Sequence, residues 1–519
     1  MSDGSLTSGD GNPWRGKRIP GTRRRSLPPL RGARGLALEA LITFAREEVF
    51  LGKTLDQLYQ QQNTPPRDRR LATELASETL RRGYALDAIL SQYVVRGRDS
   101  VEPDLWHLLQ LGACQILCLR HIPAHAAVHE TVELCEQIGK QRAKGFVNGT
   151  LRSIERELTV HEGISLPNLE QLPELLPQSD WRANRWPQLI QRGAGYEVQT
   201  IELSRDVFDD PTDPFQVLSY IAQVTSLPDW LIQRWNQHEI KEGRGPKPYD
   251  QLMARGLWFT TPGRLSLRVN SQRATTESVL QMLAEQNLPS RGGQLPESIV
   301  LQGSTAVTEL PGFHEGDFSV QDESAMLATA LLNPQPGESI LDLCAAPGGK
   351  TCHIAERLQG TGRVVACDVS PERIRTIQHN VDRLQLKNVE VFGLDPEGKY
   401  TPPGPFDAVL VDVPCSNTGV LGKRPEARWR LTPKDFQELV PLQKQLLHRA
   451  LDLVKPGGRV VYSTCSIDSE ENSDLVRSVL NERADAELKE EVFHQPGHPA
   501  DGGYQCLIFR KTSPAESGH

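Results

Sequence analysis

The sequence lacks several features that would assign it to a membrane or a secreted class. It contains no apolar run long enough to cross a bilayer and no signal-peptide core, so a cytoplasmic protein is expected. Its 9 cysteines are few for 519 residues and irregularly spaced, which favours reduced thiols over a disulfide framework. The chain is too long for one hydrophobic core, so several domains are expected.

Charge is unevenly distributed along the chain. The net charge of −8 argues, on average, against a nucleic-acid partner. Residues 13–34, however, carry arginine and lysine without any acidic side chain. We predict a disordered basic tail over residues 1–34, which is either solvated or in contact with phosphate groups. Residues 513–519 are predicted to form a short flexible tail.

Helical periodicity dominates residues 35–158. Leu36, Leu38 and Leu41 are spaced for one face of a helix, and similar patterns recur throughout this range. An all-helical domain is therefore predicted here. Residues 159–255 contain frequent prolines and no regular pattern, so we expect a connector with a few short helices.

From residue 256 onward, strand and helix patterns are mixed. Short alternating runs over 256–320 predict a small α+β subdomain. Strands alternate with helices over 321–512, which predicts a parallel, doubly wound α/β sheet of the Rossmann type. Ligands of such sheets bind at the carboxyl ends of the strands. The five expected strands are 339–344, 363–368, 388–392, 406–413 and 459–463.

A turn rich in small residues follows the first of these strands. Its glycines and alanines would let a ligand approach the backbone at a helix N-terminus, although tight packing of strand against helix would also explain them. The glycine spacing does not match a phosphate-binding P-loop. The turn consists of Cys344, Ala345, Ala346, Pro347, Gly348, Gly349 and Lys350.

Carboxylates follow the second and third strands. Asp368 lies nineteen residues after Gly349, where an acidic side chain can accept hydrogen bonds from ribose hydroxyls. Asp395 follows the third strand and is a candidate for contact with a nucleoside base. Carboxylates beside a turn without phosphate-binding features suit a cationic nucleoside, such as S-adenosylmethionine.

Two cysteines follow the fourth and fifth strands. Asp412 and Cys415 come after one apolar run, and Cys465 comes after the other. A single free cysteine is often a small buried hydrophobe, but two thiols beside a methyl donor match methylation at carbon 5 of a pyrimidine. A thiolate adds to carbon 6 and makes carbon 5 nucleophilic. Asp412 is placed so that its carboxyl group, hydrogen-bonded to the ring nitrogen, can stabilise the charge that develops on the ring.

These motifs resemble those of a known family. The segments 341–350, 412–416 and 463–466 are similar to motifs of bacterial Sun/RsmB-type 16S rRNA (cytosine-5)-methyltransferases, of the NOL/NOP2/Sun group. The helical region, through residues 128–133 and 144–152, resembles the NusB-like RNA-binding domain that precedes the catalytic part in this subfamily.

The resemblance implies an activity and residue roles. It implies that a monomer transfers a methyl group from S-adenosyl-L-methionine to carbon 5 of a cytosine in ribosomal RNA. Cys465 would be the nucleophile, and Cys415 would assist product release. Asp395 departs from the family pattern because it precedes Pro396. The implied cofactor contacts are the turn 344–350, Asp368, Asp395 and Asp412.

The roles of other polar residues are open. Lys350 either reaches the target nucleotide or is solvated. Arg268 and Asn270 are candidates for contact with the RNA backbone, and Trp429 lies among Arg424, Arg428 and Arg430, which would offer charge and a stacking surface. Cys114 and Cys118 lie one helical turn apart without a partner pair, so they are expected in the core and no metal site is predicted.

Two other functions are compatible with parts of the sequence. A methyltransferase acting on a protein or a small molecule would share the glycine turn and Asp368 but would not need paired thiols. A non-catalytic RNA-binding or antitermination factor could be built on the helical domain alone. The intact motifs around Cys415 and Cys465 favour the RNA methyltransferase over both.

Overall fold

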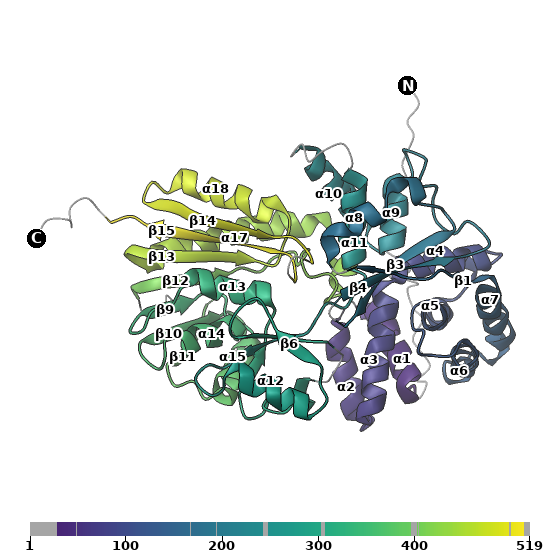
Figure 1. The fold of residues 1–519 in the computed structure, drawn as a ribbon, viewed down its shortest axis with the longest axis horizontal. Helices are drawn as coiled ribbons and strands as arrows, with labels where there is room; N and C mark the ends of the chain where they lie inside the picture. Colours follow the sequence, from purple (N-terminus) through teal and green to yellow (C-terminus); the bar gives the residue numbers. More distant parts are fainter. Residues whose placement is uncertain are drawn as a thin grey trace, which may run out of the picture. The chain divides into compact units, whose positions relative to one another are not determined.

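A computed structural model describes residues 29–512 except 48, 167, 194, 242–247, 303–306, 396–401, 403, 498 and 499. Most of the predicted basic tail and the predicted tail 513–519 therefore lie outside the described residues. The chain divides into two compact units (Figure 1). Unit 1 comprises Met1–Pro262 and Leu421–Arg430, and unit 2 comprises Gly263–Val420 and Leu431–His519. Within the described ranges, no helix combines the length and hydropathy that crossing a membrane requires.

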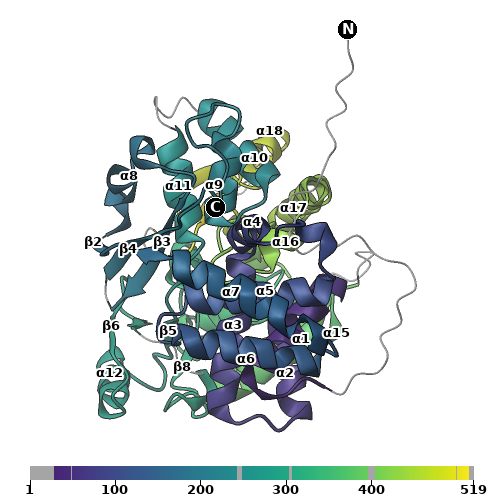
Figure 2. The same cartoon turned by 90° about the vertical axis from the view of Figure 1, so that its right-hand side faces the viewer.

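The N-terminal part of unit 1 is all helical, which confirms the prediction for this region. Leu36, Leu38 and Leu41 are buried on the first helix, as their spacing predicts. The fifth helix is buried from Leu105 to Leu117 and packs against the sixth and seventh, as Figure 2 shows. The helices are α1 (Gly32–Glu47), α2 (Leu51–Gln61), α3 (Pro66–Arg81), α4 (Gly83–Tyr93), α5 (Pro103–Leu117), α6 (Ala124–Gln137) and α7 (Lys144–Glu157).

The structure corrects the expectation of a connector over residues 159–255. This part of unit 1 holds an antiparallel sheet in which β4 (Gly195–Glu202) pairs with β1 (Thr159–Val160), β2 (Ile164–Leu166) and β3 (Arg185–Arg192). Pro187 makes β3 look like a loop in the sequence. In the described residues β3 pairs with β4 alone, and an edge strand of this kind tolerates proline. The helices here are α8 (Leu172–Leu175), α9 (Val217–Thr225), α10 (Asp229–Lys241) and α11 (Pro248–Trp258).

A segment that follows Cys415 in the sequence also belongs to unit 1. It contains α16 (Ala427–Arg430), where the Arg428 guanidinium is fully buried and the Trp429 ring is 3% exposed. Neither side chain can therefore offer the charged stacking surface expected from the sequence. The Trp429 indole donates to the carbonyl of Leu80 at 2.9 Å. Arg428 donates to the carbonyl groups of Arg81, Ser226, Phe259 and Leu421 at 2.6–3.0 Å.

Unit 2 contains a small antiparallel sheet with the strand order β6-β7-β5-β8. Arg268 lies on the inner strand β5 and Asn270 directly follows it, and both side chains are fully buried. Arg268 forms an ion pair with Glu356, so the expected contact of these residues with RNA is wrong. A central strand that is covered on both faces leaves no side chain for RNA. The elements are β5 (Ser266–Val269), α12 (Thr276–Glu285), β6 (Ser290–Gly292), β7 (Ser298–Leu301) and β8 (Phe318–Val320).

The large sheet of unit 2 confirms the predicted Rossmann-like α/β class. Its order is β11-β10-β9-β12-β13-β15-β14, which the labels of Figure 1 follow from bottom to top. The first five strands are parallel, and an antiparallel pair that the sequence did not reveal completes the edge. The strands are β9 (Ser339–Asp342), β10 (Arg363–Asp368), β11 (Val389–Gly393), β12 (Phe406–Asp412), β13 (Val454–Thr464), β14 (Ala486–His494) and β15 (Gly503–Arg510).

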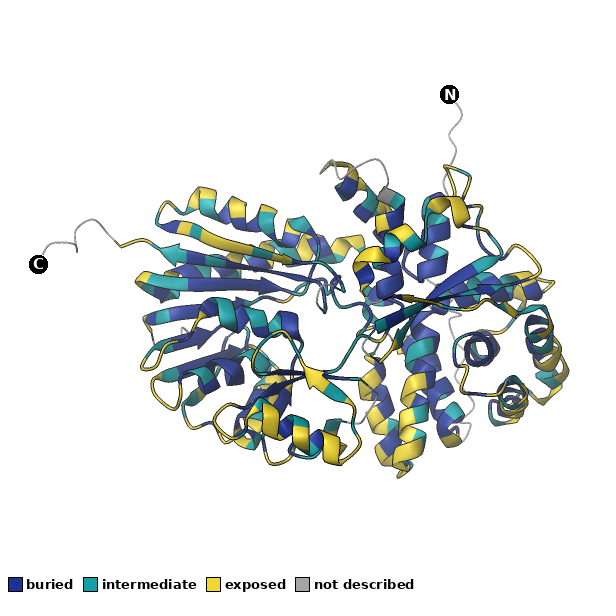
Figure 3. Ribbon diagram, in the orientation of Figure 1, coloured by how far each residue is buried: buried dark blue, intermediate teal, exposed yellow. Residues whose placement is uncertain are grey.

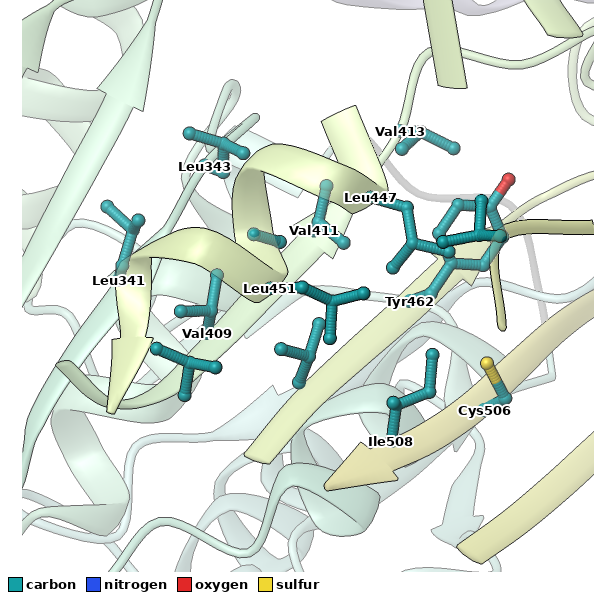
Figure 4. Close-up of a cluster of buried hydrophobic side chains, with 14 of the residues drawn as sticks. Leu341, Leu343, Val409, Val411, Val413, Leu447, Leu451, Tyr462, Cys506 and Ile508 are labelled. Atoms are coloured by element: carbon teal, nitrogen blue, oxygen red, sulfur yellow. The ribbon is translucent and has the colours of Figure 1, made fainter. Parts of the chain in front are cut away.

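Helices cover both faces of this sheet, and the central strands are buried over most of their length (Figure 3). Along β12, Val409 and Val411 belong to one core and Ala408 and Leu410 to the other. The first core, drawn in Figure 4, includes α17 (Pro433–Leu453) and α18 (Ser473–Glu482). The second includes α13 (Glu323–Leu332), α14 (Gly349–Arg357) and α15 (Pro371–Arg383). This two-sided burial explains why the strands read as continuous apolar runs.

Candidate active site

The candidate site lies where the strand order of the large sheet reverses. From β9 the chain proceeds to β10 on one side and later to β12 on the other. In open α/β sheets, a crevice for ligands forms at this point, outside the carboxyl ends of the strands. The predicted site residues follow the carboxyl ends of β9, β10, β11, β12 and β13, so the fold gathers them at one edge.

The small-residue turn joins β9 to α14. Gly348 has a φ of +102°, which side-chain-bearing residues rarely adopt. A Cβ at this position would also lie 3.3 Å from the Cα of Ile377 on α15. Glycine is therefore required for the turn itself, and the turn presents backbone at the N-terminus of α14.

Two of the predicted carboxylates come from the ends of neighbouring strands. Asp368 is the last residue of β10 and pairs in register with Gly393 of β11. Its side chain accepts a hydrogen bond from the backbone of Ser370 at 3.2 Å and lies 3.3 Å from the guanidinium of Arg373. The amide of Leu394 donates to the carbonyl of Asp368 at 2.8 Å, and Asp395 follows Leu394 in the loop after β11.

Asp342, at the end of β9, is a further carboxylate that the sequence analysis did not single out. Burial raises its pKa to about 7, and the Thr351 hydroxyl donates to its Oδ2 at 2.6 Å. Its Oδ1 is buried and has no hydrogen-bond donor among the described residues. A buried acceptor in this state is suited to a donor group of a ligand.

Lys350 and Asp412 form an ion pair at the centre of the site. The Lys350 Nζ lies 2.7 Å from Oδ2 of Asp412, and the lysine side chain is 16% exposed. Burial lowers the pKa of Lys350, but the charge and hydrogen bond of Asp412, together with nearby Cys465 and Asp342, outweigh burial, and the net pKa is raised. Lys350 is therefore a held cation rather than a solvated side chain.

The two predicted cysteines are in contact. Cys415 follows β12 and Cys465 follows β13, and these strands pair with Asp412 opposite Ser463. Their Sγ atoms lie 3.0 Å apart, and both thiols are free. The neighbouring Cys465 thiol and burial raise the pKa of Cys415 well above its ordinary value. Cys415 therefore remains a proton-bearing thiol beside Cys465.

Four other cysteines, all of them buried, have structural roles. Burial raises the pKa values of Cys352, Cys367 and Cys506 to about 12, which leaves these thiols unreactive. Cys114 is buried in the helical core as expected, whereas Cys118 is only half-buried and accepts a hydrogen bond from Gln188 at 3.7 Å.

A buried polar network, which the sequence analysis missed, supports the cysteine loops. The Glu471 carboxylate is fully buried and accepts hydrogen bonds from the amide and hydroxyl groups of Ser416 and from Gln443. The Thr418 hydroxyl donates to Asp468 at 2.7 Å. In the sequence, the acidic run 468–471 has the composition of a solvated loop, and only its proximity to Cys465 hints at another role.

Comparison with known proteins identifies two families that the chain resembles. A family model described as 16S rRNA methyltransferase RsmB/F matches residues 329–515, and a NusB family model matches residues 31–156. The chain is similar to the solved structure of PH0851, with a TM-score of 0.65 over 94% of this chain and all of the other. Their identity is 23%, so this likeness concerns the fold alone.

Relatives with higher identity span most of the sequence. The chain is 34% identical over 461 residues to the probable ribosomal RNA small subunit methyltransferase B of Synechocystis sp., covering 87% of this chain and 90% of that one. It is 31% identical to the corresponding probable enzyme of Bacillus subtilis, covering 88% and 89% of the two chains. On these grounds, the chain belongs to the RsmB/F family of 16S rRNA methyltransferases.

Proposed function

We propose that the protein transfers a methyl group from S-adenosylmethionine to carbon 5 of a cytosine in 16S rRNA, through a covalent adduct with Cys465. The observation that carries this proposal is the contact between two free thiols at 3.0 Å, beside the Lys350–Asp412 pair. A methyltransferase for a protein or a small molecule would not need this arrangement.

The residues around the turn suit the cofactor. Asp368 would hold the ribose hydroxyls, and the unpartnered Oδ1 of Asp342 offers a further acceptor. The residues 345–349 have no side chain larger than proline, so the backbone at the start of α14 is open to close approach. Asp395 is proposed as a contact to the nucleoside base. The cofactor, when bound, supplies the methyl group.

The thiols and the ion pair would perform the chemistry on the base. The Cys465 thiolate bonds to carbon 6, and the displaced electrons make carbon 5 nucleophilic. Asp412, held by Lys350, would hydrogen-bond and orient the ring, and the Lys350 cation beside it would stabilise the negative charge that develops. After methyl transfer, a base removes the proton from carbon 5, the bond between sulfur and carbon 6 breaks, and Cys415 assists this release.

The proposal extends to how the RNA is presented. A cytosine inside a helix cannot reach thiols at the end of a sheet, so the target should be single-stranded or flipped out. The NusB-like helices of unit 1 are proposed to bind the RNA, with the protein acting as a monomer. A 16S rRNA substrate implies action in the cytoplasm.

Substitution of the two cysteines tests the proposal. Cys465→Ala should abolish methyl transfer, whereas Cys415→Ala should leave enzyme covalently trapped on RNA. RNA containing 5-fluorocytosine should trap the wild type but not Cys465→Ala, as seen by denaturing electrophoresis. If Cys465→Ala retains activity, the mechanism is wrong. Bisulfite sequencing of ribosomal RNA from a deletion strain would identify the target nucleotide.

A further inference from the structure

Asn417, two residues after Cys415, joins the two cysteine loops through its side-chain amide. Its Nδ2 donates to the backbone carbonyl of Cys415 at 2.8 Å, and its Oδ1 accepts from the Cys465 Sγ at 3.2 Å. The orientation of the amide is fixed, because a carbonyl oxygen can only accept and the NH2 group must face it. The oxygen of Asn417 therefore faces the Cys465 thiol.

This orientation also fixes the hydrogen bond between the sulfur atoms. A thiol has one proton, and Cys465 donates its proton to Asn417. In the contact at 3.0 Å, Cys415 is consequently the donor and Cys465 the acceptor. The Asn417 oxygen by itself favours the neutral Cys465 thiol, but the Cys415 donor stabilises negative charge on the Cys465 sulfur, and Cys415 receives no equivalent bond from Cys465.

The backbone conformation of Asn417 suggests that its side-chain amide has a function beyond the turn. Asn417 has a φ of +62°, in the left-handed region that favours glycine. Glycine would satisfy the turn without any side chain, while asparagine tolerates it and adds the amide. Gly419, two residues after Asn417, brings the loops together, since its amide donates to the carbonyl of Cys465 at 2.9 Å.

We infer that Asn417 is a positioning residue that aims the Cys465 thiol and fixes the direction of the hydrogen bond between the cysteines, so that Cys465 rather than Cys415 attacks. This inference rests on the proposed function, because it concerns the same nucleophile. The pKa of Cys415, raised by its thiol neighbour and by burial, agrees with Cys415 keeping its proton.

Asn417→Gly is the direct test, because glycine accepts the backbone conformation and removes only the amide. We expect kcat for methyl transfer to fall about tenfold, which corresponds to the loss of one hydrogen bond. The KM values for RNA and S-adenosylmethionine should be unchanged. Asn417→Asp keeps an acceptor but loses the donor and adds negative charge beside the thiols, so it should be slower than Asn417→Gly.

A second readout does not depend on RNA or methyl transfer. Alkylation by iodoacetamide, quantified for each cysteine by mass spectrometry, should favour Cys465 over Cys415 in the wild type. In Asn417→Gly this preference should fall by about the same factor as kcat. Asn333→Gly is the matched control, because exposed Asn333 also has a positive φ, of +49°, and ends α13.

The outcomes separate the inference from the function on which it rests. An unchanged kcat and an unchanged alkylation preference in Asn417→Gly would overturn the role of Asn417. An equal fall in kcat in Asn417→Gly and Asn333→Gly would also overturn it. So would a fall in kcat that is explained by a lower unfolding temperature of Asn417→Gly. Activity in Cys465→Ala would instead overturn the proposed mechanism, whatever Asn417→Gly does.

Discussion

Glu471 accepts hydrogen bonds from both the backbone amide and the hydroxyl group of Ser416, the residue that follows Cys415. The carboxylate is fully buried, and burial raises its pKa. Its own backbone carbonyl accepts from the Tyr462 hydroxyl at 2.6 Å, which ties the acidic segment to β13. A single buried side chain thus connects the loops that carry the two cysteines.

Glu471→Ala should destabilise unit 2 by about 3 kcal/mol, because the Ser416 amide and the Gln443 amide would lose a buried acceptor. The free energy of unfolding, from urea titration, measures this. Glu470→Ala is the control, since Glu470 is exposed and precedes Glu471 directly. Equal stability of both variants would contradict the role assigned to Glu471.

Lys350→Met should lower kcat for methyl transfer by about 100-fold or more, because the charge-stabilising pair with Asp412 is lost. Lys455→Met is a matched control. Lys455 forms a pair of the same 2.7 Å length with Asp407, near the opposite end of β12. Retention of full activity in Lys350→Met would show that Lys350 is only a partner of Asp412 and takes no part in the chemistry.

Arg428→Met should destabilise unit 1 by about 3 kcal/mol, since several buried carbonyl groups lose their donor. Thermal unfolding followed by circular dichroism measures the change. Arg430→Met should have little effect, because the Arg430 guanidinium stacks on exposed Phe50 at 4.4 Å and the methionine stem can replace this contact. A similar loss in both variants would contradict the special role of Arg428.

His107 should make unit 1 sensitive to acid. Burial lowers its pKa to about 4, and Gln110 accepts or donates at its Nδ1 at 2.9 Å. The folded state therefore favours neutral imidazole, and stability is lost as pH falls from about 6.5, the ordinary value, towards 4. The full loss corresponds to about 3 kcal/mol.

Urea titrations at pH 7.5 and 4.5 measure this loss. In His107→Gln, the difference in unfolding free energy between the two pH values should shrink. His121→Gln, at an exposed position, should behave as the wild type does. An unchanged pH dependence in His107→Gln would rule out His107 as the cause.

Much of the large sheet could be predicted because its strands are buried on both faces. Ala408 to Val411, for example, form an apolar run. The start of α17 could also be predicted, because Thr432 followed by Pro433 is typical of a helix N-terminus, and the structure has a capping box there with Asp435. The edge strand β14 could not be predicted. Exposed and half-exposed charged residues occupy its middle, so neither apolar alternation nor a continuous run is visible in its sequence.

The identities of the site residues could be predicted better than their partners. Cys415 and Cys465 follow two apolar runs, and parallel strands bring such ends together. The burial of Arg268, Arg428 and Glu471 could not be predicted, because each is neutralised or hydrogen-bonded by groups far away in sequence. A charged side chain reads as exposed until its partner is known.

The chain leaves unit 2 shortly after Cys415, contributes Leu421–Arg430 to unit 1, and returns before α17. The two units are therefore interleaved and cannot be separated by one cut. A fragment beginning at Gly263 would keep every proposed catalytic side chain, yet it would carry Arg428 and Trp429 without the helices that bury them. If such a fragment were inactive, the result would not show that RNA binding by unit 1 is needed for activity. A deletion of unit 1 must therefore also replace Leu421–Arg430 with a short polar linker.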